Sequence, residues 1–261
     1  WTAGSTNGQG VWINFANMGQ ALGFRGRTIR CASAKGYRGF RVFSWVVLWC
    51  AVFASEPMLS QSVQVAVMQY KGGGDWYSNP TSVPNLVTFC NDELGTRIDA
   101  EVPYVEVGSP ALFNYPFIHM TGHGNVVFSP SEARNLRTWL EAGGFLHISD
   151  NYGMDAFVRK EMRKVFPDLD WVELPFEHPV YHVAFDFEDG PPKIHEHDGD
   201  AAQGFGLLLD GRLVCYYDVE CDLGDGWEDY AVHRDPEMVR RRALEMGANL
   251  LTFAMKGGRD D

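Results

Sequence analysis

The sequence is short of positive charge. It contains 22 Lys and Arg residues against 34 Asp and Glu residues, a formal net charge of −12 over 261 residues. Proteins that bind nucleic acids need clustered Lys and Arg to neutralise phosphates. The deficit therefore excludes a nucleic-acid-binding protein. Hydrophobic residues make up 45% of the chain, and this content excludes a disordered protein because it is sufficient to form a buried core.

Residues 1–54 lack acidic side chains, although they contain six Lys and Arg residues. Lys35 begins a basic segment that is followed by an uncharged run, 42–53, and then by Ala54. The run is shorter than the roughly 20 apolar residues that a membrane span needs. The pattern predicts a secretory signal peptide over 35–54, cleaved after Ala54, with an uncleaved anchor as the alternative. We expect residues 1–34 to be untranslated or disordered, because they show no periodicity.

Cysteine is scarce after residue 54, where Cys90, Cys215 and Cys221 remain. Three cysteines cannot form the disulfide framework that stabilises many small secreted domains. We expect buried free thiols, with one disulfide between Cys215 and Cys221 as the alternative. Residues 55–261 are predicted to form a single exported domain, periplasmic or otherwise extracytoplasmic, with no membrane span after signal cleavage.

Strand-like apolar segments alternate with helical patterns along this domain. Ser129, Pro130 and Glu132 supply the N-cap, the first position and the third position of a complete helix start. The alternation predicts an α/β domain with a mostly parallel sheet, helices on both faces and a late β-hairpin that turns at Asp210-Gly211. We expect strands at 63–68, 116–121, 145–149, 171–174, 206–209 and 212–217, and an extended segment at 97–107. We expect helices at 82–94, from Ser129 to Gly143, at 155–165 and from Asp235-Pro236 onward.

Two polar loops follow expected parallel strands, where ligands bind in open α/β sheets. The first loop contains Gly122, His123, Gly124 and Asn125, and the second contains Asp150 and Asn151. Glycine lets the backbone approach a ligand closely, and Asp150 stands where a nucleophile or base often lies. The alternative is structural, with a glycine turn in the first loop and a helix cap at Asp150.

An earlier loop, at 71–80, carries three glycines followed by Trp76 and Tyr77. It matches neither the P-loop pattern nor the dinucleotide-binding pattern, so we expect no nucleotide site. Trp76 and Tyr77 are candidates for a flat surface against a sugar ring, and packing within the domain is the alternative for both.

Histidine is missing from the first 118 residues, and all eight histidines lie between positions 119 and 233. His195 and His197 form an H-x-H pair, which on an extended chain points both imidazoles in one direction, as a metal requires. We identify His195, His197 and Asp198 as candidate ligands of a divalent metal, zinc or calcium, with Glu196 or a distant carboxylate as the alternatives to Asp198. A hydrogen-bonded polar loop without metal is the alternative.

Residues 218–229 contain six carboxylates in twelve positions. The run lacks the spacing of a calcium-binding loop, so a solvated loop is the favoured interpretation, and a site for a hard cation such as calcium is the alternative. Gly224, Gly226 and Trp227 are unusual in a merely solvated segment, and they indicate a loop of defined shape.

Several long blocks of the sequence together resemble one bacterial family, catalogued as a domain of unknown function, family four-one-five-nine. This family is similar to the class I glutamine amidotransferase-like superfamily, whose flavodoxin-like α/β sheet also occurs in ThuA-like proteins. The resemblance covers essentially all of residues 62–256. The blocks that carry it are GGGDWYSNP (72–80), FNYPFIHMTGHGNVVFS (113–129), LRTWLEAGGFLHISDNYGMD (136–155), PKIHEHDG (192–199) and GDGWEDYAVHRDPE (224–237).

The resemblance implies a nucleophile on the turn after a strand and a His-Pro-Glu motif before the last helix. The turn at 148–154 has no cysteine, so we do not expect glutamine amidotransferase activity. His233 begins a segment similar to His-Pro-Glu with two residues inserted. We therefore name Asp150, as nucleophile or base, with His123 and His233 as candidate catalytic residues. The candidate substrate-binding residues are Gly122, Gly124, Asn125, Asn151, Trp76 and Tyr77.

Two functions remain open from the sequence. The first is binding or hydrolysis of a small polar molecule at the strand ends, and the ThuA-like resemblance implies a carbohydrate-like one. The second is a non-catalytic interaction with cell-envelope proteins. The resemblance implies the latter through relatives that are fused to, or encoded near, membrane proteins of the MoxR and von Willebrand A type.

Overall fold

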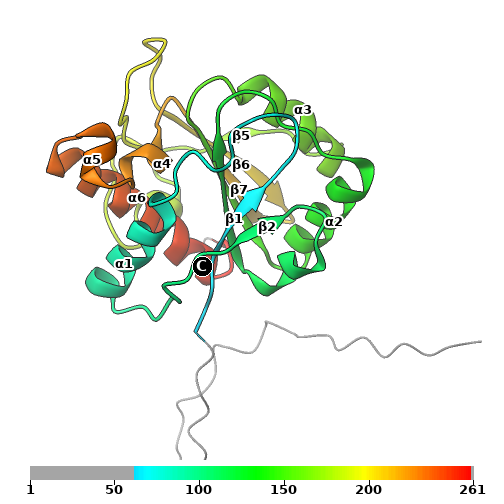
Figure 1. Ribbon diagram of the computed structural model, residues 1–261, viewed down its shortest axis with the longest axis horizontal. Coiled ribbons are helices and arrows are strands. Elements are labelled where there is room, and N and C mark those ends of the chain that lie inside the picture. Colours follow the sequence, from blue (N-terminus) through cyan, green and yellow to red (C-terminus); the bar gives the residue numbers. More distant parts are fainter. Residues whose placement is uncertain (1–61, 260–261) are drawn as a thin grey trace, which may run out of the picture. The chain divides into compact units, whose positions relative to one another are not determined.

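One seven-stranded sheet forms the centre of the part of the chain that the computed structural model describes, residues 62–259 (Figure 1). The predicted signal peptide, its cleavage after Ala54 and segment 1–34 lie outside the described residues. The strand order is β2-β1-β3-β4-β7-β6-β5. The strands are β1 (Ala66–Gln69), β2 (Tyr104–Glu106), β3 (Phe117–Gly122), β4 (Phe145–Asp150), β5 (Val172–Glu173), β6 (Gln203–Leu209) and β7 (Arg212–Val219).

Most strand pairs of the sheet are parallel. Strands β2, β1, β3, β4 and β7 run in one direction, whereas β6 is antiparallel to both β7 and β5. The β6–β7 hairpin turns at Asp210 and Gly211, which both have positive φ, at 51° and 76°. The predicted mostly parallel α/β sheet with a late hairpin is therefore confirmed.

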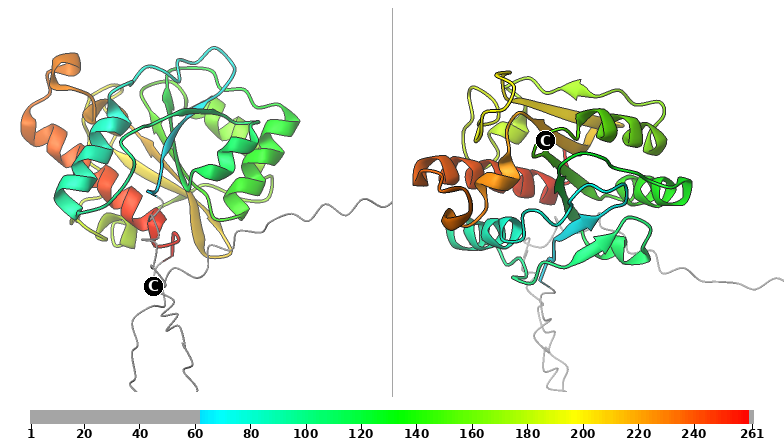
Figure 2. Two further views of the ribbon diagram at one scale, coloured as in Figure 1. Left: turned by 60° about the horizontal axis from the view of Figure 1, so that its bottom comes forward. Right: turned by 45° about the horizontal axis from the view of Figure 1, so that its top comes forward.

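Helices cover both faces of the sheet (Figure 2). Helices α2 and α3 lie over one face, and α1 and α6 lie over the other. Short helical turns occupy several of the connections. The helices are α1 (Ser82–Leu94), η2 (Pro110–Asn114), α2 (Pro130–Glu141), α3 (Asp155–Val165), η3 (Pro179–Tyr181), α4 (Leu223–Gly226), α5 (Tyr230–His233) and α6 (Glu237–Met255).

The predicted start of α2 is present in the structure. The Ser129 hydroxyl accepts from the Glu132 N–H, and the Glu132 carboxylate accepts from the Ser129 N–H at 2.7 Å. This reciprocal pair satisfies two N–H groups that have no partner within the helix. Gly143, with φ of 116°, follows the end of the helix and turns the chain into β4.

Alternating strand residues form a separate core on each face of the sheet. In β1, Met68 packs with Leu136 of α2 in one core, whereas Val67 packs with Leu86 of α1 in the other. Both faces are buried, as expected for parallel strands enclosed by helices. No helix among residues 62–259 is long and apolar enough to cross a membrane.

The acidic run at 218–229 is not a solvated loop, and that prediction is wrong. Asp218 and Asp222 are fully buried, Glu228 is 2% exposed, and the run contains α4. Each of these three buried carboxylates has at least one polar partner. Glu228, for example, accepts hydrogen bonds from the Thr81 and Ser82 N–H groups at the start of α1. The run therefore has a defined structure, as its glycines and tryptophan indicated.

The cysteine prediction is confirmed for the described residues, where Cys90, Cys215 and Cys221 are all buried free thiols. Burial raises the pKa of the Cys90 thiol to about 12, which keeps it protonated. None of the three therefore has the low pKa of a reactive cysteine.

Candidate metal centre

Three histidines and three aspartates from separate parts of the chain meet around α4. His195 lies at the centre of this group. Its Nδ1 is 3.2 Å from Asp222 Oδ2 and 3.4 Å from Asp225 Oδ2, and its Nε2 is 3.2 Å from Asp235 Oδ2. We call this group the His/Asp cluster. Its members are His195, His197, His233, Asp222, Asp225 and Asp235.

Three members of the cluster are close enough to share one metal ion. His195, Asp225 and His233 each offer one ligand atom, and these atoms all lie within 4.8 Å of one another. His233 Nε2 is 3.7 Å from Asp225 Oδ2, and the two imidazole centroids are 5.0 Å apart. Two imidazole nitrogens and one carboxylate oxygen form a donor set typical of zinc, whereas calcium prefers oxygen donors alone.

Asp222 is a fully buried carboxylate within the cluster. Its Oδ2 is 2.5 Å from His197 Nε2, in addition to its contact with His195, but its Oδ1 has no hydrogen-bond partner. A buried carboxylate oxygen without a partner is energetically costly. Asp222 also adopts a left-handed backbone conformation, with φ of 55°. The cluster thus contains one buried acceptor whose own protein contacts leave it unsatisfied.

Charges within the cluster are strongly coupled. Hydrogen bonds to Asp222 and then to Asp225 raise the pKa of His195 to about 10. Burial alone would raise the pKa of Asp225, but hydrogen bonds from His195 and Asn79 outweigh burial and lower it. The ionised form of Asp225 is therefore favoured beside an imidazole that takes up a proton readily. A metal cation could take the place of that positive charge.

The position of α4 depends on contacts with both the sheet and α6. The Gly224 N–H donates to Ser149 Oγ at the end of β4, at 3.1 Å. A Cβ at Gly226 would lie 2.5 Å from Ala243 Cβ of α6, so only glycine allows this approach. The Ile194 N–H donates to the Cys221 carbonyl, at 2.9 Å. This bond places His195 beside α4.

A buried polar chain lies within the sheet below α4. His119 Nδ1 is 3.0 Å from His147 Nδ1, and His147 Nε2 is 2.6 Å from Asp218 Oδ2. Burial lowers the pKa of His147 to about 3 and raises the pKa of Asp218 well above its usual range. Burial therefore favours the neutral form of both partners. His119 Nε2 is buried without a partner and faces Gly224.

Asp150 is mostly buried, and both of its oxygens have protein partners. Its Oδ1 accepts from the Tyr152 and Met154 N–H groups, each at 2.9 Å, and its Oδ2 accepts from the Tyr217 hydroxyl at 3.0 Å. Burial raises the pKa of Asp150 above its ordinary value. These contacts hold the turn before α3, but Asp150 is not the helix cap of the structural alternative, because the N-cap of α3 is Met154.

The other two candidate catalytic residues have different partners from Asp150. His123 is half-exposed and pairs with Asp75, with 3.1 Å between Nδ1 and Oδ2. His233 lies in the His/Asp cluster beside Asp225. Each residue of the proposed Asp150, His123 and His233 group thus has its own local set of hydrogen bonds or ion pairs.

The loop that contains Gly122, Gly124 and Asn125 is pinned to the loop after β1. Asn125 Nδ2 donates to the Gly72 carbonyl, and the Gly74 N–H donates to the Asn125 carbonyl, each at 3.0 Å. A Cβ at Gly122 would clash with the Tyr70 hydroxyl.

Trp76 and Tyr77 lie in the same loop after β1. The Trp76 ring packs edge-on against Tyr77 and Tyr104, at centroid distances of 5.3 and 5.1 Å. Tyr77 is 61% exposed. Packing accounts for Trp76, and the Tyr77 ring is open to solvent.

Of the three predicted metal ligands, two lie together in the structure and the third, Asp198, lies apart from them. His195 and His197 both reach Asp222, so the two imidazoles of the H-x-H pair do converge. Asp198 instead accepts a hydrogen bond from the Tyr152 hydroxyl at 3.2 Å, and the Tyr152 ring stacks on His197. The residues that sequence reasoning missed are Asp222, Asp225 and Asp235. The glycines and tryptophan inside the acidic run were the available signal for the first two.

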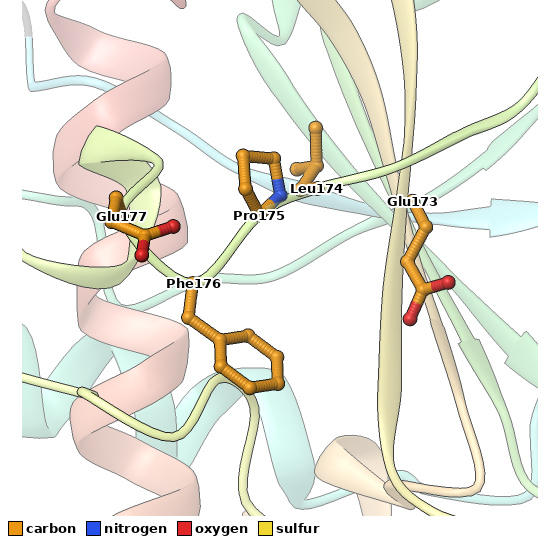
Figure 3. A pocket seen from close by; sticks show the side chains of 5 residues that line it. All are labelled: Glu173, Leu174, Pro175, Phe176 and Glu177. Carbon is orange, nitrogen blue, oxygen red and sulfur yellow. The ribbon is translucent and has the colours of Figure 1, made fainter.

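A surface hollow elsewhere on the domain is lined by five consecutive residues, Glu173, Leu174, Pro175, Phe176 and Glu177 (Figure 3). It follows β5, and it contains neither histidine nor any member of the His/Asp cluster. With two carboxylates and apolar side chains, it offers no nucleophile or metal-binding imidazole.

Comparison with known proteins gives a family but no activity. The family described as "Domain of unknown function (DUF4159)" matches residues 64–255. No curated protein matches the chain. The matched range contains every member of the His/Asp cluster.

Proposed function

Because the chain belongs to the family described as Domain of unknown function (DUF4159), whose description states no activity, we propose a function from the site itself. We propose that the domain binds a divalent metal ion at the His/Asp cluster and hydrolyses a small polar molecule there. The observation that carries this proposal is the convergence of His195, Asp225 and His233, with ligand atoms within 4.8 Å of one another.

Zinc, or a transition metal of similar preference, suits these ligands best. Structural zinc sites use four protein ligands, whereas catalytic zinc sites use three and leave one position for water or substrate. His195, Asp225 and His233 provide three. Asp222 Oδ2 lies 3.2 Å from His195 Nδ1, so this carboxylate stands beside the three ligands, and the fourth position is left to water. Asp235, on the other nitrogen of His195, fits the carboxylate that commonly orients a metal-bound histidine.

Hydrolysis follows from what such an ion supplies. A zinc ion held by these residues would lower the pKa of a bound water to about 7 and would thereby supply hydroxide at neutral pH. Asp222 Oδ1, which is buried and has no protein partner, would be the carboxylate oxygen free to act as a proton acceptor in such a site. We further infer a carbohydrate-like substrate, from the resemblance to ThuA-like proteins, which is an argument at the level of the fold.

Metal analysis of the full chain, purified without a His tag, tests this proposal. We expect near-stoichiometric metal in the wild type and its loss in the His195→Ala/His233→Ala variant. His182→Ala is the matched control, because His182 pairs with Asp186 outside the cluster. Any hydrolysis found with carbohydrate esters must also disappear in the double variant. A wild-type protein without metal, after growth with zinc, calcium and manganese, would refute the proposal.

We also infer a flavodoxin-like, amidotransferase-like topology and an exported location. The order of the five parallel strands, β2-β1-β3-β4-β7, supports the topology, because flavodoxin-like sheets have their parallel strands in the order 2-1-3-4-5. The basic and apolar pattern of residues 35–54 supports export. N-terminal sequencing of the protein from a periplasmic fraction tests export, since cleavage after Ala54 leaves Ser55 as the first residue.

A second candidate function is a non-catalytic interaction with cell-envelope proteins. Tyr230, Val232 and Met238 favour it, because these apolar side chains are between 53% and 79% exposed on α5 and the start of α6. Exposed apolar residues that gather on one surface often mark contact sites. Under this function, a Val232→Ser/Met238→Ser variant would no longer co-fractionate with envelope membranes, whereas the cluster variant His195→Ala/His233→Ala would still do so.

A further inference from the structure

We propose that Asn79 and Asn151 are positioning residues for the metal ligand Asp225. Asn79 Nδ2 donates to Asp225 Oδ1 at 2.5 Å, Asn151 Nδ2 donates to Asn79 Oδ1 at 2.6 Å, and Thr121 Oγ donates to Asn151 Oδ1 at 2.9 Å. We call these three linked bonds the amide chain. This inference rests on the proposed metal site and adds residues that hold that site in shape.

The negative charge of Asp225 sets which group donates and which accepts in every bond of the amide chain. An ionised carboxylate can only accept hydrogen bonds, so the Asn79 amide must present its NH₂ group to Asp225. Its carbonyl oxygen is then left to accept from Asn151. The Asn151 oxygen in turn accepts the Thr121 hydroxyl. Because all the dipoles point the same way, each bond polarises the next and strengthens the one that ends on Asp225.

The amide chain links two neighbouring strands of the sheet and the loop before α1 to α4. Thr121 lies in β3, Asn151 follows β4, and Asn79 lies between β1 and α1. All three are buried, with Asn151 2% and Asn79 7% exposed. The amide of Asn151 is therefore engaged inside the protein, and the structure assigns it to support of the metal ligand. The sequence had placed Asn151 among the substrate-binding residues.

The consequence of the amide chain is a fixed orientation of Asp225. The bond from Asn79 occupies Oδ1, and the other oxygen, Oδ2, faces His195 at 3.4 Å and His233 at 3.7 Å. A carboxylate held in this way is oriented before the metal arrives. Residues that orient metal ligands typically contribute 10–100-fold to metal affinity.

The test measures Zn²⁺ affinity of the full chain by competition with a chelator, for wild type, Asn79→Ala, Asn79→Ser and Asn151→Ala. Asn135→Ala is the matched control. Asn135 is also a partly buried amide, and it donates to the Val107 and Ser109 carbonyls without contact to the cluster. The melting temperature of each metal-free protein and the visible spectrum of its Co²⁺ form are recorded alongside.

We expect Asn79→Ala to weaken Zn²⁺ binding roughly 10–100-fold and to alter the Co²⁺ spectrum. Asn79→Ser, which keeps a short donor, should recover part of the affinity. Asn135→Ala should lower the melting temperature without changing the Zn²⁺ affinity. If Asn79→Ala and Asn79→Ser lower only the melting temperature and bind Zn²⁺ as tightly as wild type, the inference is overturned and the proposed metal site stands. If the wild type binds no Zn²⁺, both are overturned.

Discussion

The imidazole of His147 lies 2.6 Å from the carboxylate of Asp218, and both side chains are fully buried. Ser149 Oγ donates to the second oxygen of Asp218 at 3.0 Å. The same hydroxyl oxygen accepts a hydrogen bond from the Gly224 N–H. This pair therefore connects the interior of the sheet to the turn that carries Asp222 and Asp225.

The protonation of Asp218 can be tested by substitution. Since burial raises its pKa well above the usual range, we expect Asp218→Asn to retain most of the stability. Asp218→Ala should cost about 2–4 kcal/mol, because it leaves His147 and Ser149 without a buried partner. Urea unfolding of both variants measures this difference. Equal losses would show that Asp218 is ionised and that its charge is needed.

Asp150 should make stability depend on pH. Its pKa is raised in the folded protein, so its favourable contribution is complete below the unfolded value of about 4 and is lost as pH rises through the folded value. Asp150→Asn should therefore gain stability relative to wild type as the pH rises from about 4 through the folded pKa of Asp150. Thermal unfolding of both proteins across this range measures the gain. A constant difference between the two proteins would contradict the raised pKa.

Tyr152 holds a backbone conformation that only glycine adopts without strain, with φ of 139°. Such conformations cost of order 1–3 kcal/mol, so Tyr152→Gly should stabilise the protein by about 1 kcal/mol, despite the loss of the ring stacked on His197. Tyr77→Gly is the control, because Tyr77 is an exposed tyrosine without positive φ. If both variants lose stability equally, the stacked ring outweighs the strain.

Metal should stabilise the fold by mass action. At a free Zn²⁺ concentration of about 100 times Kd, the gain is about 2.7 kcal/mol. For a domain of this size we expect an increase in Tm of roughly 5–10 °C. His233→Ala should abolish most of this increase, and His182→Ala should keep it. Ca²⁺ at the same concentration should raise Tm much less, because two of the three ligands are imidazoles. An equal increase in Tm with Ca²⁺ would indicate that the carboxylates alone bind the ion.

Much of the fold could be predicted because its signals are local. Helices 82–94 and 155–165 have the predicted bounds, and the Ser129 start and the Asp210-Gly211 turn depend on neighbouring residues. Helices α4 and α5 were missed because each spans four residues, too few to show a helical period. Burial of Asp218 could not be predicted, because its partner His147 lies 71 residues away in the sequence.

The candidate site was harder to predict because its residues lie far apart in the sequence. The H-x-H pair identified His195, but Asp225 and His233 follow it by 30 residues or more and approach it only through α4 and α5. Asp198 was predicted as a ligand because it is close to the pair in the sequence, whereas the folded chain turns Asp198 toward Tyr152. The acidic run contained the missing ligands, but composition alone does not distinguish a carboxylate in solvent from one that is buried against imidazoles.

The sheet ends in its two shortest strands, β2 with three residues and β5 with two. An edge strand exposes unpaired N–H and C=O groups, on which another chain can add a strand. Edges this short present few such groups, and Glu106 and Glu173 place a charge on each of them. The two ends of the sheet are thereby protected against edge-to-edge aggregation.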